Sequence, residues 1–138
     1  MGTWGTGIFE DDTALDAMEQ AMQTSASDYM TQILPYCEQD YLEFSEAHQV
    51  MIAGVILDHV LNGTPYETND EAFENWLEQQ AAPDNAGQFT DFKPLIVRGL
   101  KLMTSGQSEL GELWQENEVD YPTWLGNVEA MIARLEQA

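Results

Sequence analysis

The feature that most constrains the fold of this chain is an apolar segment near its middle. In SEAHQVMIAGVILDHVLNG, the run from Val50 to Leu57 contains no charged residue. Ser45 is a favourable helix N-cap and Asn62-Gly63 is a favourable stop signal, so the segment predicts one helix. The apolar run is too short to span a bilayer. A helix that is apolar on nearly every side needs other helices to cover it, which predicts a central place in a bundle.

Helical spacing dominates the remainder of the chain as well. Apolar residues recur at intervals of three and four, and no alternating strand pattern stands out. Ser25, Asn69 and Ser108 are expected to cap helices, and Pro35 is expected to end one. The other expected helices cover approximately residues 13–22, 26–35, 70–80, 91–103, 109–116 and 122–135. We therefore predict the all-α class, as a single compact bundle of about six to seven helices that forms one domain over residues 1–138.

Particular residues within these helices are expected to form the core. The expected inward residues are Leu15, Met18, Met22, Phe73, Trp76, Leu77, Leu110, Leu113, Trp114 and Trp124. Gly54, in the middle of the central helix, costs about 1 kcal/mol relative to alanine, which indicates that another helix approaches closely there. The segment 36–44 is compatible with a loop or with one short extended piece.

The N-terminal sequence MGTWGTGIFEDD needs an explanation for its glycines. A phosphate-binding loop is disfavoured, because the spacing matches no such motif and acids follow where a phosphate would bind. Gly5 and Gly7 permit a sharp turn that lets Trp4 and Phe9 bury large apolar areas. We therefore expect a structural strap over residues 4–9, and we expect Trp4→Ala to lower the melting temperature more than any acid-to-amide change among the three acids that follow.

Those acids could also bind a metal. Glu10, Asp11, Asp12 and Asp16 offer the oxygen ligands that calcium and magnesium prefer. The D-x-D-x-D-G calcium loop is missing, however, and acids at the start of a helix are stabilised by its dipole without any metal. Helix capping by Asp11 or Asp12 is the favoured interpretation, and a metal site is the alternative.

The two histidines and the single cysteine form no recognisable catalytic pattern. His48 and His59 lie about 16 Å apart along one helix, which is too far for one metal ion to bridge. Both histidines are expected at the surface or at its boundary. Cys37 has no disulfide partner, and a buried thiol is commoner than a nucleophilic one. We expect no catalytic residue and no cofactor.

The chain is unusually acidic. It carries 25 acids and 4 bases, for a formal charge of −21, and no lysine or arginine precedes Lys93. Nucleic acid is a poor direct partner and an anionic membrane is excluded, because both require basic side chains. A basic protein would be attracted at long range. Adaptation to high salt, or solubility alone, explains the acidity equally well. The lone cysteine and the absence of a secretory signal indicate the cytoplasm.

Three segments of the chain resemble a bacterial family catalogued as domain of unknown function 4259. They are MGTWGTGIFEDDTALD, VMIAGVILDHVLNG, and SELGELWQEN followed by a tryptophan. Typical members begin M-G-x-W-G-x-G-x-F-x-N-D-x-A-x-D, have an Ala-rich central helix, and contain S-E-L-x-E-L-W near the end. This chain differs in having Asp11 in place of asparagine and a bulkier central helix. The motif residues here are Trp4, Gly5, Gly7, Phe9, Asp12, Ser108, Glu109, Leu110, Leu113, Trp114 and Trp124.

The resemblance implies a helical fold but transfers no activity. Small acidic proteins of such families resemble immunity proteins that neutralise bacterial toxins. Our leading hypothesis is a helical binding protein whose acidic surface engages a basic partner, such as a toxin domain. The candidate partner-binding residues are Tyr36, Glu38, Asp40, Tyr41, Glu43, Tyr66 and Glu67. The alternatives are a nucleic-acid mimic that blocks a DNA-binding protein, and a metal-dependent enzyme or binder that uses the N-terminal acids.

Overall fold

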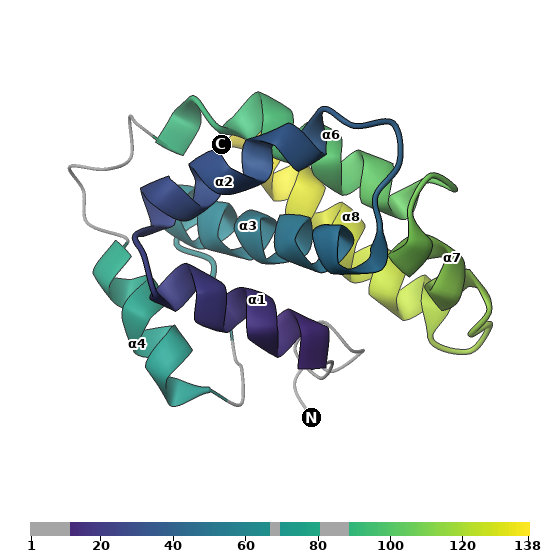
Figure 1. The fold of residues 1–138 in the computed structure, drawn as a ribbon, viewed down its shortest axis with the longest axis horizontal. Helices are drawn as coiled ribbons and strands as arrows, with labels where there is room; N and C mark the ends of the chain where they lie inside the picture. The colour runs from purple at the N-terminus through teal and green to yellow at the C-terminus, as the bar shows by residue number, and fades with distance from the viewer. Residues whose placement is uncertain (1–11, 67–69, 81–88) are drawn as a thin grey trace.

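The computed structural model describes residues 12–66, 70–80 and 89–138, and it confirms the all-α prediction (Figure 1). The helices in these ranges are α1 (Asp12–Met22), α2 (Ala26–Cys37), α3 (Phe44–Asn62), α4 (Glu71–Gln80), α6 (Lys93–Thr104), α7 (Glu109–Gln115) and α8 (Tyr121–Gln137). The expected strap over residues 4–9 lies outside the described residues.

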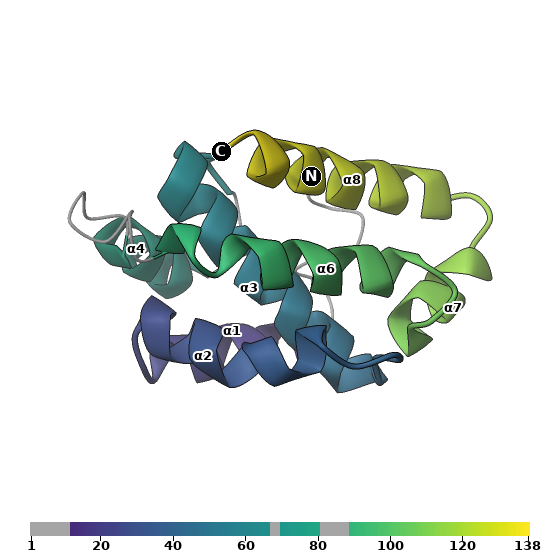
Figure 2. The ribbon, with the colours of Figure 1, turned by 90° about the horizontal axis from the view of Figure 1, so that it is seen from above.

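Helix α3 occupies the centre of the molecule, as its apolar sequence predicts. It contacts α1, α2, α4, α6, α7 and α8. In Figure 2 it runs obliquely between α1 and α2 on one side and α8 on the other. From Val50 to His59 every residue of α3 is buried. A helix buried in this way has no free face, so the positions available for binding lie at its two ends.

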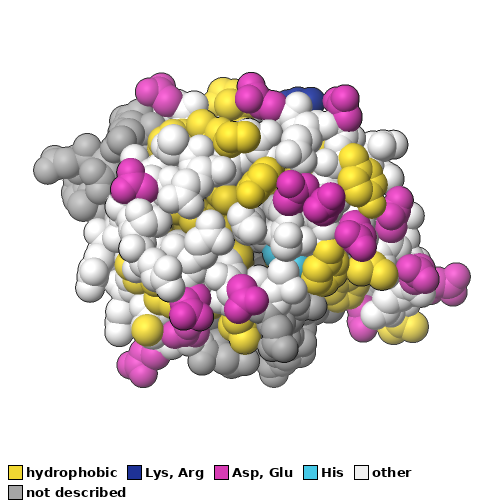
Figure 3. Space-filling view, in the orientation of Figure 1, with side chains coloured by type: hydrophobic (Ala, Val, Ile, Leu, Met, Phe, Trp, Pro, Cys, Tyr) yellow, Lys and Arg dark blue, Asp and Glu magenta, His cyan; other side chains and the backbone are white. Residues whose placement is uncertain are grey.

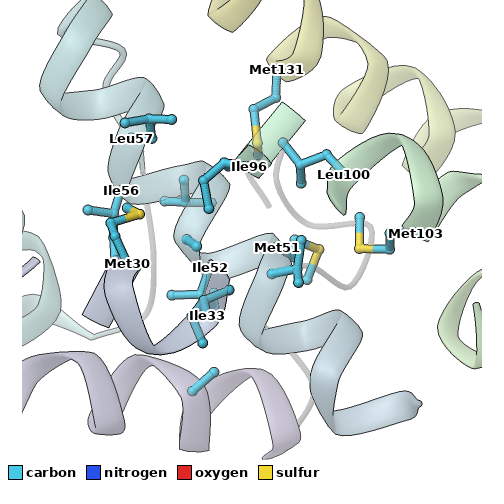
Figure 4. Close-up of a cluster of buried hydrophobic side chains, with 14 of the residues drawn as sticks. Met30, Ile33, Met51, Ile52, Ile56, Leu57, Ile96, Leu100, Met103 and Met131 are labelled. Atoms are coloured by element: carbon cyan, nitrogen blue, oxygen red, sulfur yellow. The ribbon is translucent and has the colours of Figure 1, made fainter. Parts of the chain in front are cut away.

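The core is built of aliphatic side chains and methionines from four helices (Figure 4). The labelled residues, all at most 1% exposed, are Met30 and Ile33 of α2, Met51, Ile52, Ile56 and Leu57 of α3, Ile96, Leu100 and Met103 of α6, and Met131 of α8. Full burial of such a side chain contributes about 1.5–3 kcal/mol.

The predicted close approach at Gly54 is confirmed. A Cβ atom there would lie 2.8 Å from Sδ of Met131 and 2.9 Å from Cδ1 of Leu100. A side chain at this position would therefore push on both α6 and α8.

The helix ends agree with the sequence in part. Gly63 ends α3 in the left-handed conformation, with φ of 70°, and Ser25 caps α2 by accepting the N–H of Asp28. Ser45 was the wrong cap for α3. The helix starts one residue before it, and the Glu46 carboxylate accepts the N–H of Glu43 at 3.0 Å in a capping box.

Two further helix ends differ from the prediction. Helix α2 continues through Pro35 to Cys37, so the proline does not end it; the chain leaves the helix two residues later, where the N–H of Glu38 bonds back to Pro35 O. At α4, the side chain of Asp70 accepts the N–H of Phe73 at 3.2 Å. Asp70 therefore provides the cap that was expected from Asn69, which lies outside the described residues.

Burial corrects four expectations. His48 is 1% exposed and His59 is 7% exposed, so neither lies at the surface. The ring of Phe44 covers His48 edge-on, with centroids 4.7 Å apart. Conversely, Leu15 is 40% exposed and Leu113 is 48% exposed. Helix α1 instead buries its alanines together with Met18; the alanines are Ala14, Ala17 and Ala21.

Candidate functional site

The chain before α3 and the chain before α7 lie side by side. Leu42 donates its N–H to Gln107 O at 3.0 Å, and Glu109 donates its N–H to Leu42 O at 2.9 Å. These bonds form an isolated parallel bridge between Leu42 and Ser108. The ambiguous segment 36–44 therefore contains one short extended contact, and that contact brings the first turns of α3 and α7 together.

Two adjacent motif residues then start both helices. Ser108 Oγ accepts the N–H of Gly111 at 3.0 Å, which confirms it as the cap of α7. Glu109 Oε1 accepts the N–H of Phe44, the first residue of α3, also at 3.0 Å. Because the first N–H groups of a helix have no partner within it, this carboxylate satisfies one that would otherwise need water. Glu109 thus fixes the position of α3 relative to α7.

Between the two helices lies a hollow of about 300 Å³, which we call the α3–α7 hollow. It is lined by Phe44, His48, Leu110, Leu113, Trp114 and Asn117. Its volume is at the lower limit of small-molecule pockets, so it better suits one or two inserted side chains.

Aromatic packing supports one wall of the hollow. The ring of Trp114 stacks on that of Trp124, with centroids 5.4 Å apart and planes 10° from parallel. Trp124 is fully buried, as predicted for a core anchor. Leu110 is also buried, at 3% exposure, whereas Leu113 projects from the same short helix with nearly half of its surface exposed. Leu113 is thus the most accessible apolar residue of the hollow.

Carboxylates lie on the two helices that form the hollow, at the N-cap of α3 and on α7. The hydroxyl of Tyr41 donates to Glu112 Oε2 at 3.2 Å. Desolvation, this hydrogen bond, and the charges of Glu112, Glu109 and Glu43 raise the pKa of Tyr41, because all of them disfavour the phenolate. Figure 3 shows that acidic and apolar side chains gather on this end of the molecule, beside a hollow in which a histidine is visible.

The basic side chains of the chain, by contrast, are all bonded to the protein itself. Arg98 donates to the carbonyl groups of Cys37 and Gln39, and Lys93 donates to Ala138 O at 2.7 Å. The other two form ion pairs: Lys101 with Glu136 at 2.8 Å and Arg134 with Asp58 at 2.9 Å. These are all 4 lysines and arginines of the sequence, so the charge left facing solvent is predominantly negative.

The sequence-predicted partner residues are divided by the structure. Tyr41 and Glu43 are exposed and lie just before Phe44, which lines the hollow, and Glu38 and Asp40 are exposed in the segment that leads to it. Tyr36 is half-buried against the core. Tyr66 is 6% exposed, so its expected place on the surface was wrong. Glu67 lies outside the described residues.

The metal candidates are described only in part. Asp16 is exposed on α1, the side chain of Asp12 is not described, and Glu10 and Asp11 lie outside the described residues. Within the described ranges, no three His, Cys, Asp or Glu side chains are placed to hold a metal ion.

Sequence reasoning missed a buried polar network around Asp58, which is 0% exposed. Its Oδ1 accepts bonds from Asn62 at 2.8 Å and Thr64 at 3.0 Å. Its Oδ2 accepts bonds from the Tyr66 hydroxyl at 2.6 Å and from Arg134 Nε at 2.9 Å.

Each Asp58 oxygen therefore has two donors, and the network ties the end of α3 to α8 and to the segment that follows α3. Burial, together with the charge of Asp58 and the hydrogen bond to it, raises the pKa of Tyr66. With these partners all supplied by the protein, Asp58 stabilises the fold.

A second hollow, of about 340 Å³, lies beside this network. Its lining includes His59, whose Nδ1 is 2.9 Å from Thr64 O and whose Nε2 is 3.9 Å from Glu78 Oε1. Since the carbonyl of Thr64 can only accept, Nδ1 carries a proton and Nε2 faces the carboxylate.

Cys37 is a poor nucleophile at neutral pH. It is buried, and burial raises the pKa of its thiol to about 11.

Comparison with known proteins gives a family and nothing beyond it. A family model described as a domain of unknown function, DUF4259, matches residues 2–127. Neither the curated proteins nor the solved structures contain a match. No helix in the described ranges has the length and apolar character needed to cross a membrane.

Proposed function

We propose that this chain, which belongs to the family called domain of unknown function 4259, is an acidic binding protein that engages a basic protein. The name of the family states no activity, so the proposal is drawn from the surface of the chain. The most concrete form of this function is an immunity protein that occupies the cationic active site of a toxin. The observation that carries the proposal is the internal bonding of all four basic side chains.

The internal bonding matters because net charge alone does not describe a surface. The formal charge is −21, and each of the 4 cations already has a partner within the protein, including Arg98 and Lys101, which are exposed. A cationic partner would therefore meet an attractive potential from many directions, which accelerates encounter and makes it sensitive to salt. The same surface repels nucleic acid, whose binding depends on lysine and arginine.

The experiment is capture of partners on the immobilised protein from cells that produce it, at about 50 mM and about 300 mM NaCl, which differ in Debye length. We expect a basic protein that is retained at low salt, and whose purified form binds with an affinity that falls as salt rises. Binding that stays specific for one protein distinguishes this function from a general adaptation to high salt.

Two results would argue against the proposal. Recovery of no basic protein at either salt concentration would remove it. Recovery of a DNA-binding protein would support the alternative function, a nucleic-acid mimic, if added DNA competes with this chain for that protein.

A further inference from the structure

We propose that the α3–α7 hollow is the docking site for one particular kind of segment: a cationic stretch of the partner that carries a large apolar side chain. This inference rests on the proposed function and adds to it the place of contact and the chemistry of the contacting segment.

The first argument is the exposed apolar surface of the hollow. Leu113 is 48% exposed beside the half-buried ring of Trp114. Another exposed apolar residue, Val119, is 85% exposed but is not among the residues that line this hollow. An apolar side chain of a partner could displace water from Leu113 and Trp114 together, as the central anchors of protein interfaces do.

The second argument is that the hollow is already formed. Glu109 holds Phe44 by a 3.0 Å hydrogen bond, and Trp114 is fixed by its stacking on Trp124. A site whose walls are held by internal contacts loses little conformational entropy on binding, so more of the contact energy appears as affinity.

The third argument is the charge around the apolar floor. Glu43 lies at the N-terminus of α3, while Glu109, Glu112 and Glu116 lie on α7 or at its C-terminal cap. All four glutamates are exposed, and the charges of three of them, Glu43, Glu109 and Glu112, raise the pKa of Tyr41. The complement of an apolar floor with an acidic rim is an apolar side chain flanked by lysine or arginine.

The same charges disfavour a second copy of this chain as the occupant. Each copy carries a formal charge of −21, and each basic side chain already has an internal partner. Two such surfaces repel each other, whereas a basic segment is attracted.

The test uses three labelled synthetic peptides and measures fluorescence anisotropy at low salt. One peptide alternates lysine with leucine, the second contains lysine and serine at the same charge, and the third replaces the lysines of the first by glutamate. We expect the lysine–leucine peptide to bind at least about tenfold more tightly than the lysine–serine peptide, the factor that corresponds to one anchor side chain. The glutamate peptide is not expected to bind.

Two substitutions of equal charge locate the site. Leu113→Asp places a carboxylate in the hollow, and Val119→Asp places one on an exposed residue outside it. Both change the net charge by the same amount, so long-range attraction cannot distinguish them. We expect Leu113→Asp to lower the affinity for the lysine–leucine peptide about tenfold and Val119→Asp to leave that affinity nearly unchanged. Both positions are exposed, so both variants should fold, as circular dichroism will verify.

A second pair of double variants tests the acidic charge of α7. Glu112→Gln with Glu116→Gln removes two charges from α7 and its C-terminal cap, and Glu19→Gln with Glu71→Gln removes two exposed charges on α1 and α4. The first double variant should lower the affinity for the lysine–leucine peptide several times more than the second double variant does. Amide shifts in NMR spectra of the wild type should be confined to residues 41–48 and 108–117.

The outcomes separate this inference from the proposed function. If the lysine–leucine peptide binds with strong salt dependence but equally well to Leu113→Asp and Val119→Asp, the docking site is wrong and the acidic binding function stands. If neither cationic peptide binds any variant, both are contradicted. Concentration-dependent self-association that Leu113→Asp abolishes would show that a second copy occupies the hollow and would overturn the inference.

Discussion

Glu109 and Phe44, which belong to different helices, are joined by a hydrogen bond of 3.0 Å from the backbone N–H of Phe44 to Oε1 of Glu109. The bond makes a side chain of α7 a second cap of α3, in addition to the Glu43–Glu46 capping box. Since α3 is the central helix, the position of α7 and the shape of the α3–α7 hollow depend on the same contact. The stability of the fold and the geometry of the proposed docking site are thus coupled through one carboxylate.

Glu109→Ala should lower the free energy of unfolding by about 1 kcal/mol, the usual loss for a helix cap. Glu109→Gln should retain most of the stability, because its amide oxygen can still accept the N–H of Phe44. Glu118→Ala, at an exposed position after α7, is the control and should change little. Urea denaturation of the three variants measures the difference, and an equal loss for Glu109→Ala and Glu118→Ala would remove the capping role.

Gly111→Ala should destabilise the protein by about 1–3 kcal/mol, as overpacking does. An added Cβ would lie 2.6 Å from the backbone carbonyl oxygen of Met103, an atom that cannot rotate away. Gly126→Ala is the matched control in α8, because a Cβ there meets nothing within 4 Å. It should stabilise by up to about 1 kcal/mol through helix propensity. Melting temperatures that shift in the same direction would contradict this packing.

Asp58→Ala should cost about 3 kcal/mol or more, because it leaves Arg134 and the Tyr66 hydroxyl without their buried acceptor. Lys101→Met provides the comparison. It breaks an ion pair of similar length, 2.8 Å, whose side chains are 57% and 49% exposed, and exposed pairs contribute less than about 1 kcal/mol. Calorimetry of the two variants would refute the structural role of Asp58 if the losses were equal.

Cys37 should resist alkylation in the folded protein at pH 8, since its buried thiol has a pKa raised to about 11. The sign of the linked stability follows from this shift. Between the ordinary thiol pKa of about 8.5 and the folded value, the unfolded chain releases a proton that the folded chain retains. The contribution of Cys37 to stability is therefore complete below that interval and is lost as the pH rises through it. Rapid modification by iodoacetamide without denaturant would contradict the burial.

The sequence predicted those parts of the fold that depend on local pattern. The apolar run of α3, the stop at Gly63, the cap at Ser108 and the close approach at Gly54 are each visible in a few neighbouring residues, and each is confirmed. They follow from helix periodicity, capping and the absence of a side chain on glycine, which are properties of the chain before it packs.

The predictions that were wrong concern residues whose burial or partners depend on segments from elsewhere in the chain. Asp58 and Arg134 are 76 residues apart, so no local pattern shows that a buried acid has a cation. His48 is buried because the adjacent Phe44 ring and the α7 segment cover the start of α3.

Leu113 was expected in the core from its spacing. Helix α7, however, is short and lies at one end of the molecule (Figure 1), and Leu110 already fills its inward position. The exposure of Leu113, on which the proposed site depends, could not be derived from periodicity.

Hydrogen–deuterium exchange of the chain, alone and with its captured basic partner, tests the account most directly. We predict slower exchange of the amides in residues 41–48 and 108–117 in the complex, with little change in α4 and in the C-terminal half of α8. Protection confined to α4 or to the surface around His59, with residues 108–117 unchanged, would contradict the assignment of the α3–α7 hollow as the place where the partner binds.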